Sequence, residues 1–127
     1  MKKKKVKKLS YYRGKADKIL QDIGRLTYDK CLICGGEYSC LHHFILKSQS
    51  TELRYNMKNL IPICSNCHCA IHQGKSSGKV GEIVLIKGMD WLNELLKLKR
   101  LGIGKYYGRQ YFEEMYKKLK LLTPYRV

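Results

Sequence analysis

Four of the six cysteines stand in two Cys-x-x-Cys pairs, Cys31 with Cys34 and Cys64 with Cys67. Two such pairs about thirty residues apart can close a tetrahedral four-thiolate zinc site, because the loop between them is held at both ends. Two disulfides are the alternative. No apolar signal segment follows the Lys-rich N-terminus, so we expect a cytoplasmic, reducing environment and a structural zinc. For Cys40 and Cys69 we expect small buried side chains, with a substitute zinc ligand as the alternative.

All four histidines lie between and after these cysteine pairs, and two of them are four residues apart. His68 and His72 belong to S-N-C-H-C-A-I-H-Q-G, which predicts a short helix ending at Gly74. Residues i and i+4 share a helix face. Two imidazoles on one face, within reach of a third nitrogen, are typical of a site for a divalent transition metal.

The other two histidines are adjacent, in L-H-H-F-I, and a polar loop separates them from L-I-P-I. We predict two strands of a hairpin that leads into the short helix. Neighbouring strand residues point to opposite sides, so His42 and His43 do not easily hold the same metal. We therefore assign His42 to the metal and leave His43 as a general base near neutral pH. The alternative is that all four histidines form a second structural zinc site.

These residues resemble the HNH endonuclease motif, in the order His43, then Asn59 in N-L-I-P-I-C, then His68 in C-S-N-C-H. That family has the ββα-metal fold, in which a hairpin and a helix hold one catalytic metal, and two flanking Cys-x-x-Cys pairs are a common variant. The resemblance implies that His43 activates water for attack on a phosphodiester and that His42 and His68 hold the metal. It also implies that His72 is an additional ligand and that Asn59 holds the loop orienting His43.

Two positions depart from the family pattern. Many members have Asp at position 42, and many lack a histidine at position 72. A three-histidine set is softer than one containing a carboxylate. We therefore expect zinc, nickel or manganese to compete with magnesium for the catalytic site.

A narrower likeness extends over residues 15 to 122. The segments A-D-K-I-L-Q-D-I-G-R-L, H-H-F-I-L-K-S-Q-S-T-E-L-R-Y-N and G-M-D-W-L-N-E-L-L are similar to phage recombination proteins of the NinG (Rap) type. This likeness implies activity on branched DNA such as a Holliday junction, in a bacterial or phage-infected cell. A resolvase needs paired active sites, so it also implies a homodimer.

The charge predicts a polyanionic partner. The chain has 127 residues and a formal net charge of +16, which makes nucleic acid the first candidate and a membrane surface the second. No stretch approaches the length of a membrane-spanning helix. The arm M-K-K-K-K-V-K-K is either a phosphate-binding tail or a solvated terminus. Three basic residues near the proposed metal are candidates for binding DNA phosphates: Lys47, Arg54 and Lys58.

The secondary-structure elements predicted around these residues form an α+β fold. They make up a single domain over residues 10–127, after a basic arm over 1–9. A bracing helix over 10–28 precedes the zinc-stapled ββα-metal core at 31–74. A linker over 75–88 follows, in which E-I-V-L-I-K is either a strand or the start of a helix. Residues 89–127 are predicted as a helical hairpin, with Asp90 as the cap of its first helix and a second helix from Arg109 to Leu122.

Two function classes remain open from the sequence. The first is a metal-dependent DNA endonuclease with one catalytic metal (Mg²⁺, Mn²⁺, Zn²⁺ or Ni²⁺) and a structural zinc. The second is a non-catalytic zinc-binding DNA adaptor, for which the four cysteines and the positive charge suffice. A four-cysteine module does not need four histidines in this order, which favours the endonuclease.

Overall fold

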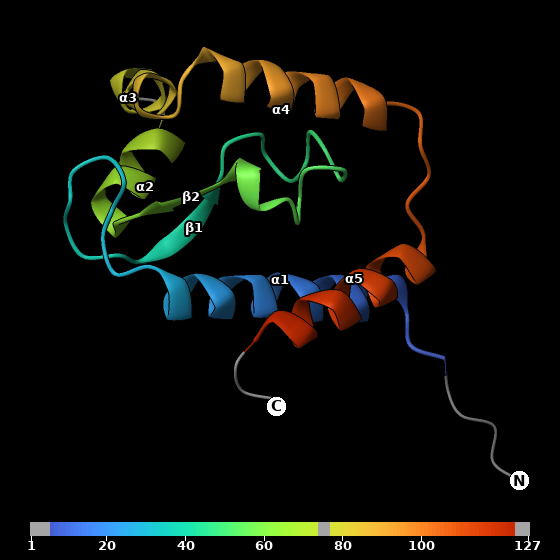
Figure 1. The fold of residues 1–127 in the computed structure, drawn as a ribbon. Helices are drawn as coiled ribbons and strands as arrows, with labels where there is room; N and C mark the ends of the chain where they lie inside the picture. The colour runs from blue at the N-terminus through green and yellow to red at the C-terminus, as the bar shows by residue number, and fades with distance from the viewer. Residues whose placement is uncertain (1–5, 74–76, 124–127) are drawn as a thin grey trace, which may run out of the picture. The chain divides into compact units, whose positions relative to one another are not determined.

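The computed structural model describes residues 6–73 and 77–123, which form an α+β fold (Figure 1). This confirms the predicted α+β class, while most of the predicted basic arm lies outside the described residues. The described residues contain five α-helices, one 3-10 helix and a two-stranded sheet, and none of these helices is long and apolar enough to cross a membrane. The elements are α1 (Leu9–Thr27), β1 (Cys40–His43), η1 (Met57–Asn59), β2 (Leu60–Ile63), α2 (Ser65–His72), α3 (Ser77–Lys87), α4 (Met89–Gly102) and α5 (Arg109–Leu122).

The chain divides into two compact units where the sequence indicated a single domain. The helical unit is formed by Met1–Ile23 with Lys105–Val127, and the sheet unit by Gly24–Gly104. The helical unit contains α5 and most of α1, while the sheet unit contains the strands and α2 to α4. The sequence predicted that the last two helices, α4 and α5, form a hairpin. These helices belong to different units, so they do not pair within one unit.

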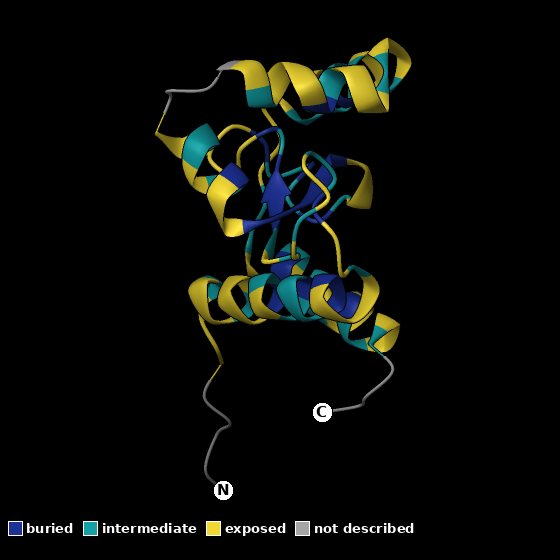
Figure 2. Ribbon diagram, turned by 90° about the vertical axis from the view of Figure 1, so that its left-hand side faces the viewer, coloured by how far each residue is buried: buried dark blue, intermediate teal, exposed yellow. Residues whose placement is uncertain are grey.

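The two strands form the predicted hairpin. β1 pairs antiparallel with β2, so that His42 lies opposite Ile61 and His43 opposite Leu60. Both strands are almost entirely buried, as their colour in Figure 2 shows. Since adjacent residues of a strand point to opposite faces, the pairing register places the two histidines on different sides of the sheet.

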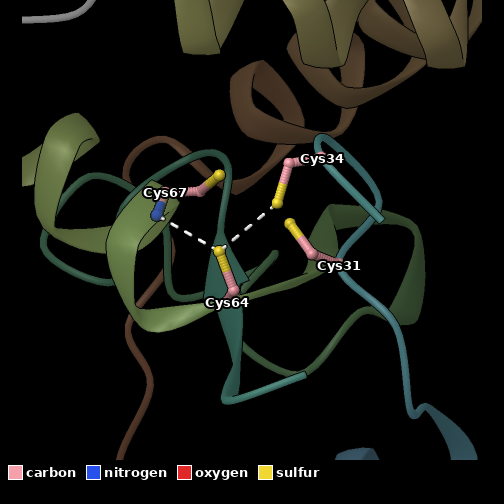
Figure 3. A group of neighbouring side chains, drawn as sticks. All are labelled: Cys31, Cys34, Cys64 and Cys67. Carbon is pink, nitrogen blue, oxygen red and sulfur yellow. Dashed lines mark hydrogen bonds between the residues drawn. The ribbon is translucent and has the colours of Figure 1, made fainter. Parts of the chain in front are cut away.

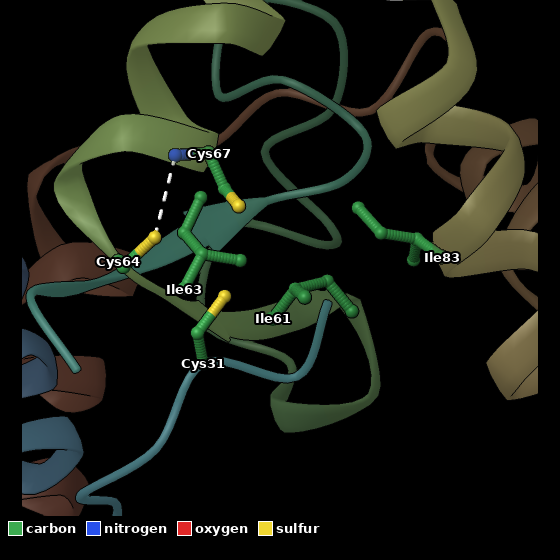
Figure 4. Close-up of a cluster of buried hydrophobic side chains, with 6 residues drawn as sticks. All are labelled: Cys31, Ile61, Ile63, Cys64, Cys67 and Ile83. Carbon is green, nitrogen blue, oxygen red and sulfur yellow. Dashed lines mark hydrogen bonds between the residues drawn. The ribbon is translucent and has the colours of Figure 1, made fainter. Parts of the chain in front are cut away.

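A cluster of buried side chains joins the sheet to the cysteine pairs and to α3. Its members come from β2, the two Cys-x-x-Cys segments and α3: Cys31, Ile61, Ile63, Cys64, Cys67 and Ile83 (Figure 4). The sequence predicted a linker over 75–88, but residues 77–87 are helical. Residues 74–76, with the predicted helix end at Gly74, lie outside the described residues. The helix forms despite its glycines because Ile83 is fully buried in this core, and packing overrides local propensity.

A second cluster anchors α4 on the polar loop between the strands. Leu95 packs with Ile45 and Leu53, and all three are buried. The ring of Trp91 lies edge-on to Phe44, with 4.8 Å between centroids, and its indole N–H donates to the carbonyl of Lys58 at 2.6 Å. The loop that follows β1 is therefore held from outside by α4.

The N-terminus of α4 differs from the prediction. Gly88 is the N-cap, with φ of +94°, and no side chain caps the helix. Asp90 lies in the first turn instead, where its charge still favours the helix dipole. The other two predicted helices are confirmed with small shifts or none, at Leu9–Thr27 and Arg109–Leu122.

Close packing explains one glycine of α1. A Cβ at Gly24 would lie 2.7 Å from Cγ of Leu41 and would also collide with the hydroxyl of Tyr38. The sequence indicated only that this glycine weakens the helix. At Gly24 the last turn of α1 therefore approaches β1 and the preceding loop too closely for a side chain.

Candidate metal centres

The four cysteines of the two pairs converge on one point (Figure 3). Their sulfur atoms all lie within 4.8 Å of one another. A tetrahedral zinc ion with four zinc–sulfur distances of about 2.3 Å needs sulfur atoms about 4 Å apart. The sulfurs of Cys34 and Cys64 are 3.6 Å apart. All six cysteines of the chain are free thiols, so the disulfide alternative is wrong and the donor set fits a structural zinc.

Local backbone geometry builds this site. Gly35 has φ of +73°, which few other residues adopt, and the amide of Gly36 donates to the sulfur of Cys34 at 3.4 Å. In the second pair, Cys64 is the N-cap of α2, and its sulfur accepts from the amide of Cys67 at 3.4 Å. Each pair thus directs a backbone N–H group at a sulfur atom, and in the second pair this favours the thiolate form of Cys64.

The pKa values of three of these cysteines are shifted, in different directions. Burial raises the pKa of Cys31, but backbone hydrogen bonds, that of Cys34 first, outweigh it and lower the pKa to about 6. The backbone of Cys67 likewise lowers the pKa of Cys64. In contrast, burial and the neighbouring sulfurs raise the pKa of Cys67. The thiolates of Cys31 and Cys64 are therefore favoured while that of Cys67 is opposed, and a bound cation would favour the thiolate form of Cys67.

Three of the four histidines form a second cluster. The ligand nitrogens of His42 from β1 and of His68 and His72 from α2 lie within 4.8 Å of one another. The Nε2 atoms of His68 and His72 are 2.8 Å apart. The hairpin and the helix therefore bring together the three residues that the sequence assigned to one metal.

Two of these imidazoles, those of His42 and His68, have lowered pKa values. Burial lowers the pKa of His42 to about 4, and the neighbouring rings of His68 and His72 contribute to the shift. Burial, followed by the charge of His72, also lowers the pKa of His68. A metal binds the lone pair of a neutral imidazole, so the lowered pKa values of His42 and His68 favour the form of these two rings that binds a cation.

His43 is oriented away from this cluster by a backbone contact. Its side chain is 8% exposed, and its Nε2 lies 2.9 Å from the carbonyl oxygen of Arg54. A carbonyl can only accept, so Nε2 carries the proton and donates it. In the neutral ring the basic lone pair is then on Nδ1. His43 is not a member of the three-histidine group.

Asn59 fastens the loop that supplies this carbonyl. Its side chain is fully buried and makes three hydrogen bonds to backbone. The oxygen accepts from the amide of Ile45 at 2.7 Å, and the nitrogen donates to the carbonyls of Ile45 at 2.9 Å and Leu53 at 3.2 Å. Asn59 therefore fixes both ends of the segment that leads to Arg54, and its role is to position rather than to react.

The three predicted phosphate ligands have different environments. Lys47 is exposed. The guanidinium of Arg54 lies over the ring of Tyr55, 5.9 Å from its centroid. Lys58 forms an ion pair with Glu94 at 2.6 Å, which the sequence did not predict. The reason is that α4 packs on the loop and brings its own carboxylate to Lys58.

The two remaining cysteines also differ from one another. The sulfur of Cys40 lies 3.3 Å from Nδ1 of His68, a contact that sequence reasoning missed. Its half-buried position agrees with the expected small packed side chain. Cys69 is exposed, however, contrary to the same expectation. Neither belongs to the four-cysteine group, and Cys40 instead contacts a member of the histidine cluster.

Comparison with known proteins finds a partial similarity. The chain is 42% identical over 53 residues to a protein described as "Mitochondrial DNA mismatch repair protein mutS homolog" from Sarcophyton glaucum. The similar segment covers 39% of this chain and 5% of that relative. No family model matches the chain, and no solved structure matches it. The similarity is too short to assign the chain to a family.

Proposed function

We propose that this protein is a metal-dependent DNA endonuclease of the HNH type. The observation that carries the proposal is that the four histidines have two different environments. Three of them, from a strand and a helix, present their nitrogens to one point, while the fourth is held in a defined tautomer by the carbonyl of Arg54. A metal-binding group and an oriented imidazole are the two components that the hydrolysis of a phosphodiester requires.

In the proposed mechanism, His43 acts as the general base. Its Nε2 proton is committed to the carbonyl of Arg54, so Nδ1 is the nitrogen that accepts the proton of the attacking water. Asn59 keeps that carbonyl in place through its three backbone hydrogen bonds. A geometry that holds the base before substrate binds lowers the entropic part of the barrier.

The histidine cluster supplies the second part of the site. His42, His68 and His72 would hold one divalent cation, and when bound this ion stabilises negative charge on the phosphate and on the leaving 3′ oxygen. By family resemblance the product carries a 5′ phosphate. Lys47 and Arg54 are the residues we propose to contact the flanking phosphates, while Lys58 is engaged with Glu94.

DNA is the proposed substrate for two reasons. The net charge of +16 favours a polyanionic partner, and the partial similarity is to a protein described as a DNA mismatch repair homolog. Activity on branched recombination intermediates, with a homodimer presenting two active sites, is the narrower form of the proposal and is supported only by the resemblance to NinG-type proteins.

The test is cleavage by the wild type and by His43→Ala. Linear duplex, single strand, flap and four-way junction are each incubated with magnesium, manganese, zinc or nickel, after metal stripping that leaves the thiolate-bound zinc in place. We expect wild-type cleavage to need added metal, and His43→Ala to lower the rate by about 10²-fold or more while keeping metal content and DNA binding.

Two other outcomes would favour different functions. If the wild type cuts no substrate with any metal but still binds DNA, the zinc-binding adaptor is the better description. If His43→Ala loses one metal equivalent, all four histidines form a structural site. His42→Ala is the matched control, because it should lose metal from the histidine cluster under every alternative that places an ion there.

A further inference from the structure

The positive charge of the chain is concentrated outside the unit that contains the candidate metal centres. The helical unit comprises 46 residues, with fifteen Lys and Arg against four Asp and Glu, a formal +11. The sheet unit comprises 81 residues, with eleven Lys and Arg against six Asp and Glu, a formal +5. About two thirds of the net charge is therefore in roughly one third of the chain.

Part of this charge lies on a continuous set of lysines and tyrosines from α1, the residues just before it, and α5. At the N-terminal end of α1, the ammonium groups of Lys7 and Lys15 lie over the ring of Tyr11, at 5.2 and 5.6 Å from its centroid. Tyr11 contacts Tyr12 edge-on, with 5.2 Å between centroids. These contacts place two cations over the ring of Tyr11, a residue that is 40% exposed.

The set continues from α1 onto α5. The rings of Tyr12 and Tyr116 are 6.4 Å apart between centroids, and the ammonium of Lys120 lies 5.8 Å from the centroid of Tyr116. Together these residues define the cation–tyrosine patch: Lys7, Tyr11, Tyr12, Lys15, Tyr116 and Lys120. Ion pairs within α5 join Glu113 to Arg109 and Lys117, none of which belongs to the patch.

We propose that the cation–tyrosine patch is a DNA-backbone binding surface, distinct from the histidine cluster, that anchors the protein on its substrate. This inference rests on DNA as the proposed partner, but it does not require that the protein cleaves DNA. Aromatic faces restrain the flexible lysine stems, which lowers the entropy cost when each ammonium meets a phosphate. The charge of the helical unit is complementary to the phosphate backbone, where binding gives affinity without sequence readout.

The experiment compares two triple variants that remove the same charge from different units. The patch variant is Lys7→Gln, Lys15→Gln and Lys120→Gln. The control variant is Lys87→Gln, Lys97→Gln and Lys99→Gln, on α3 and α4 of the sheet unit. Binding to a short fluorescein-labelled duplex is measured by anisotropy over a range of salt, without added divalent metal. Zinc content and circular dichroism check that both variants are folded.

We expect the patch variant to bind duplex about tenfold or more weakly. The slope of log affinity against log salt concentration should become less steep, by about 0.9 for each phosphate that the variant no longer neutralises. The control variant should change binding much less. A variant with Tyr11→Phe should retain wild-type affinity, because it keeps the aromatic face.

Equal decreases in affinity for the two triple variants would overturn the proposal, since binding would then follow net charge alone. The proposal would also be overturned if the patch variant bound phosphatidylserine vesicles more weakly but DNA equally well, which would make the patch a membrane-binding surface. Because no catalytic metal is added, these results do not depend on whether the protein cleaves DNA. If the protein binds DNA through the patch but never cleaves it, the proposed endonuclease activity is refuted, while the proposed role of the patch still holds.

Discussion

The thiol sulfur of Cys40 lies 3.3 Å from Nδ1 of His68, whose Nε2 in turn faces His72. When Nδ1–H donates to this sulfur, the lone pair of His68 is on Nε2, the nitrogen directed at the histidine cluster. Partners of this kind fix the ring orientation and tautomer of metal-binding histidines, and their removal commonly costs about 10- to 100-fold in metal affinity.

Cys40→Ala should therefore weaken metal binding at the histidine cluster by about tenfold or more, while Cys40→Ser, which keeps an acceptor, should recover most of the affinity. The measurement is calorimetric titration with nickel or cobalt on protein that retains its thiolate-bound zinc. Cys69→Ala is the matched control, because Cys69 is a nearby exposed cysteine. Equal affinities for Cys40→Ala and wild type would show that the contact does not orient His68.

Asn59→Ala should destabilise the sheet unit by roughly 3 kcal/mol or more, because it leaves several buried backbone groups without partners. The measurement is urea unfolding followed by the fluorescence of Trp91, which donates to the loop that Asn59 holds. Asn56→Ala is the control. Asn56 accepts from the amide of Lys58 at the start of η1, and the removal of such a cap costs only about 1 kcal/mol. Similar destabilisation in both variants would contradict the central role of Asn59.

Acidification should destabilise the protein as the pH falls from about 6.5 to about 4. Burial and the neighbouring histidines lower the pKa of His42 from 6.5 to about 4, so in this range the unfolded chain binds a proton that the folded chain does not. The free energy of unfolding therefore rises with pH across this window. Urea unfolding at a series of pH values should show a smaller slope for His42→Asn. An unchanged slope would mean that other groups cause the dependence.

Two glycines of α1 should respond oppositely to alanine. A Cβ at Gly24 would collide with Leu41 and Tyr38, so we expect Gly24→Ala to cost about 1–3 kcal/mol. At Gly14 no atom lies within 4 Å of an added Cβ, and Gly14→Ala should stabilise the helix by up to about 1 kcal/mol. Thermal or chemical unfolding of the two variants provides the comparison. A neutral Gly24→Ala would show that the end of α1 does not pack closely on β1.

Much of the local structure was predictable because it depends on spacing along the chain. The strands at Cys40–His43 and Leu60–Ile63 and the helix at Arg109–Leu122 follow from short-range patterns of apolar residues. Parts of the two candidate metal centres follow for a similar reason. Local geometry places the two cysteines of each Cys-x-x-Cys pair together, and His68 and His72 on one helix face, and the strand alternation then separates His42 from His43.

The sequence by itself determined which residues can bind metal, which elements carry them and that the charge favours a polyanionic partner. Only the tertiary structure decided contacts between segments distant in the chain: Cys40 beside His68, Lys58 paired with Glu94, and α3 held by Ile83 where a linker was predicted. It also decided the division into two units, with the last two helices in different ones. Such contacts depend on how whole elements pack, and packing can override the local preferences that a sequence displays.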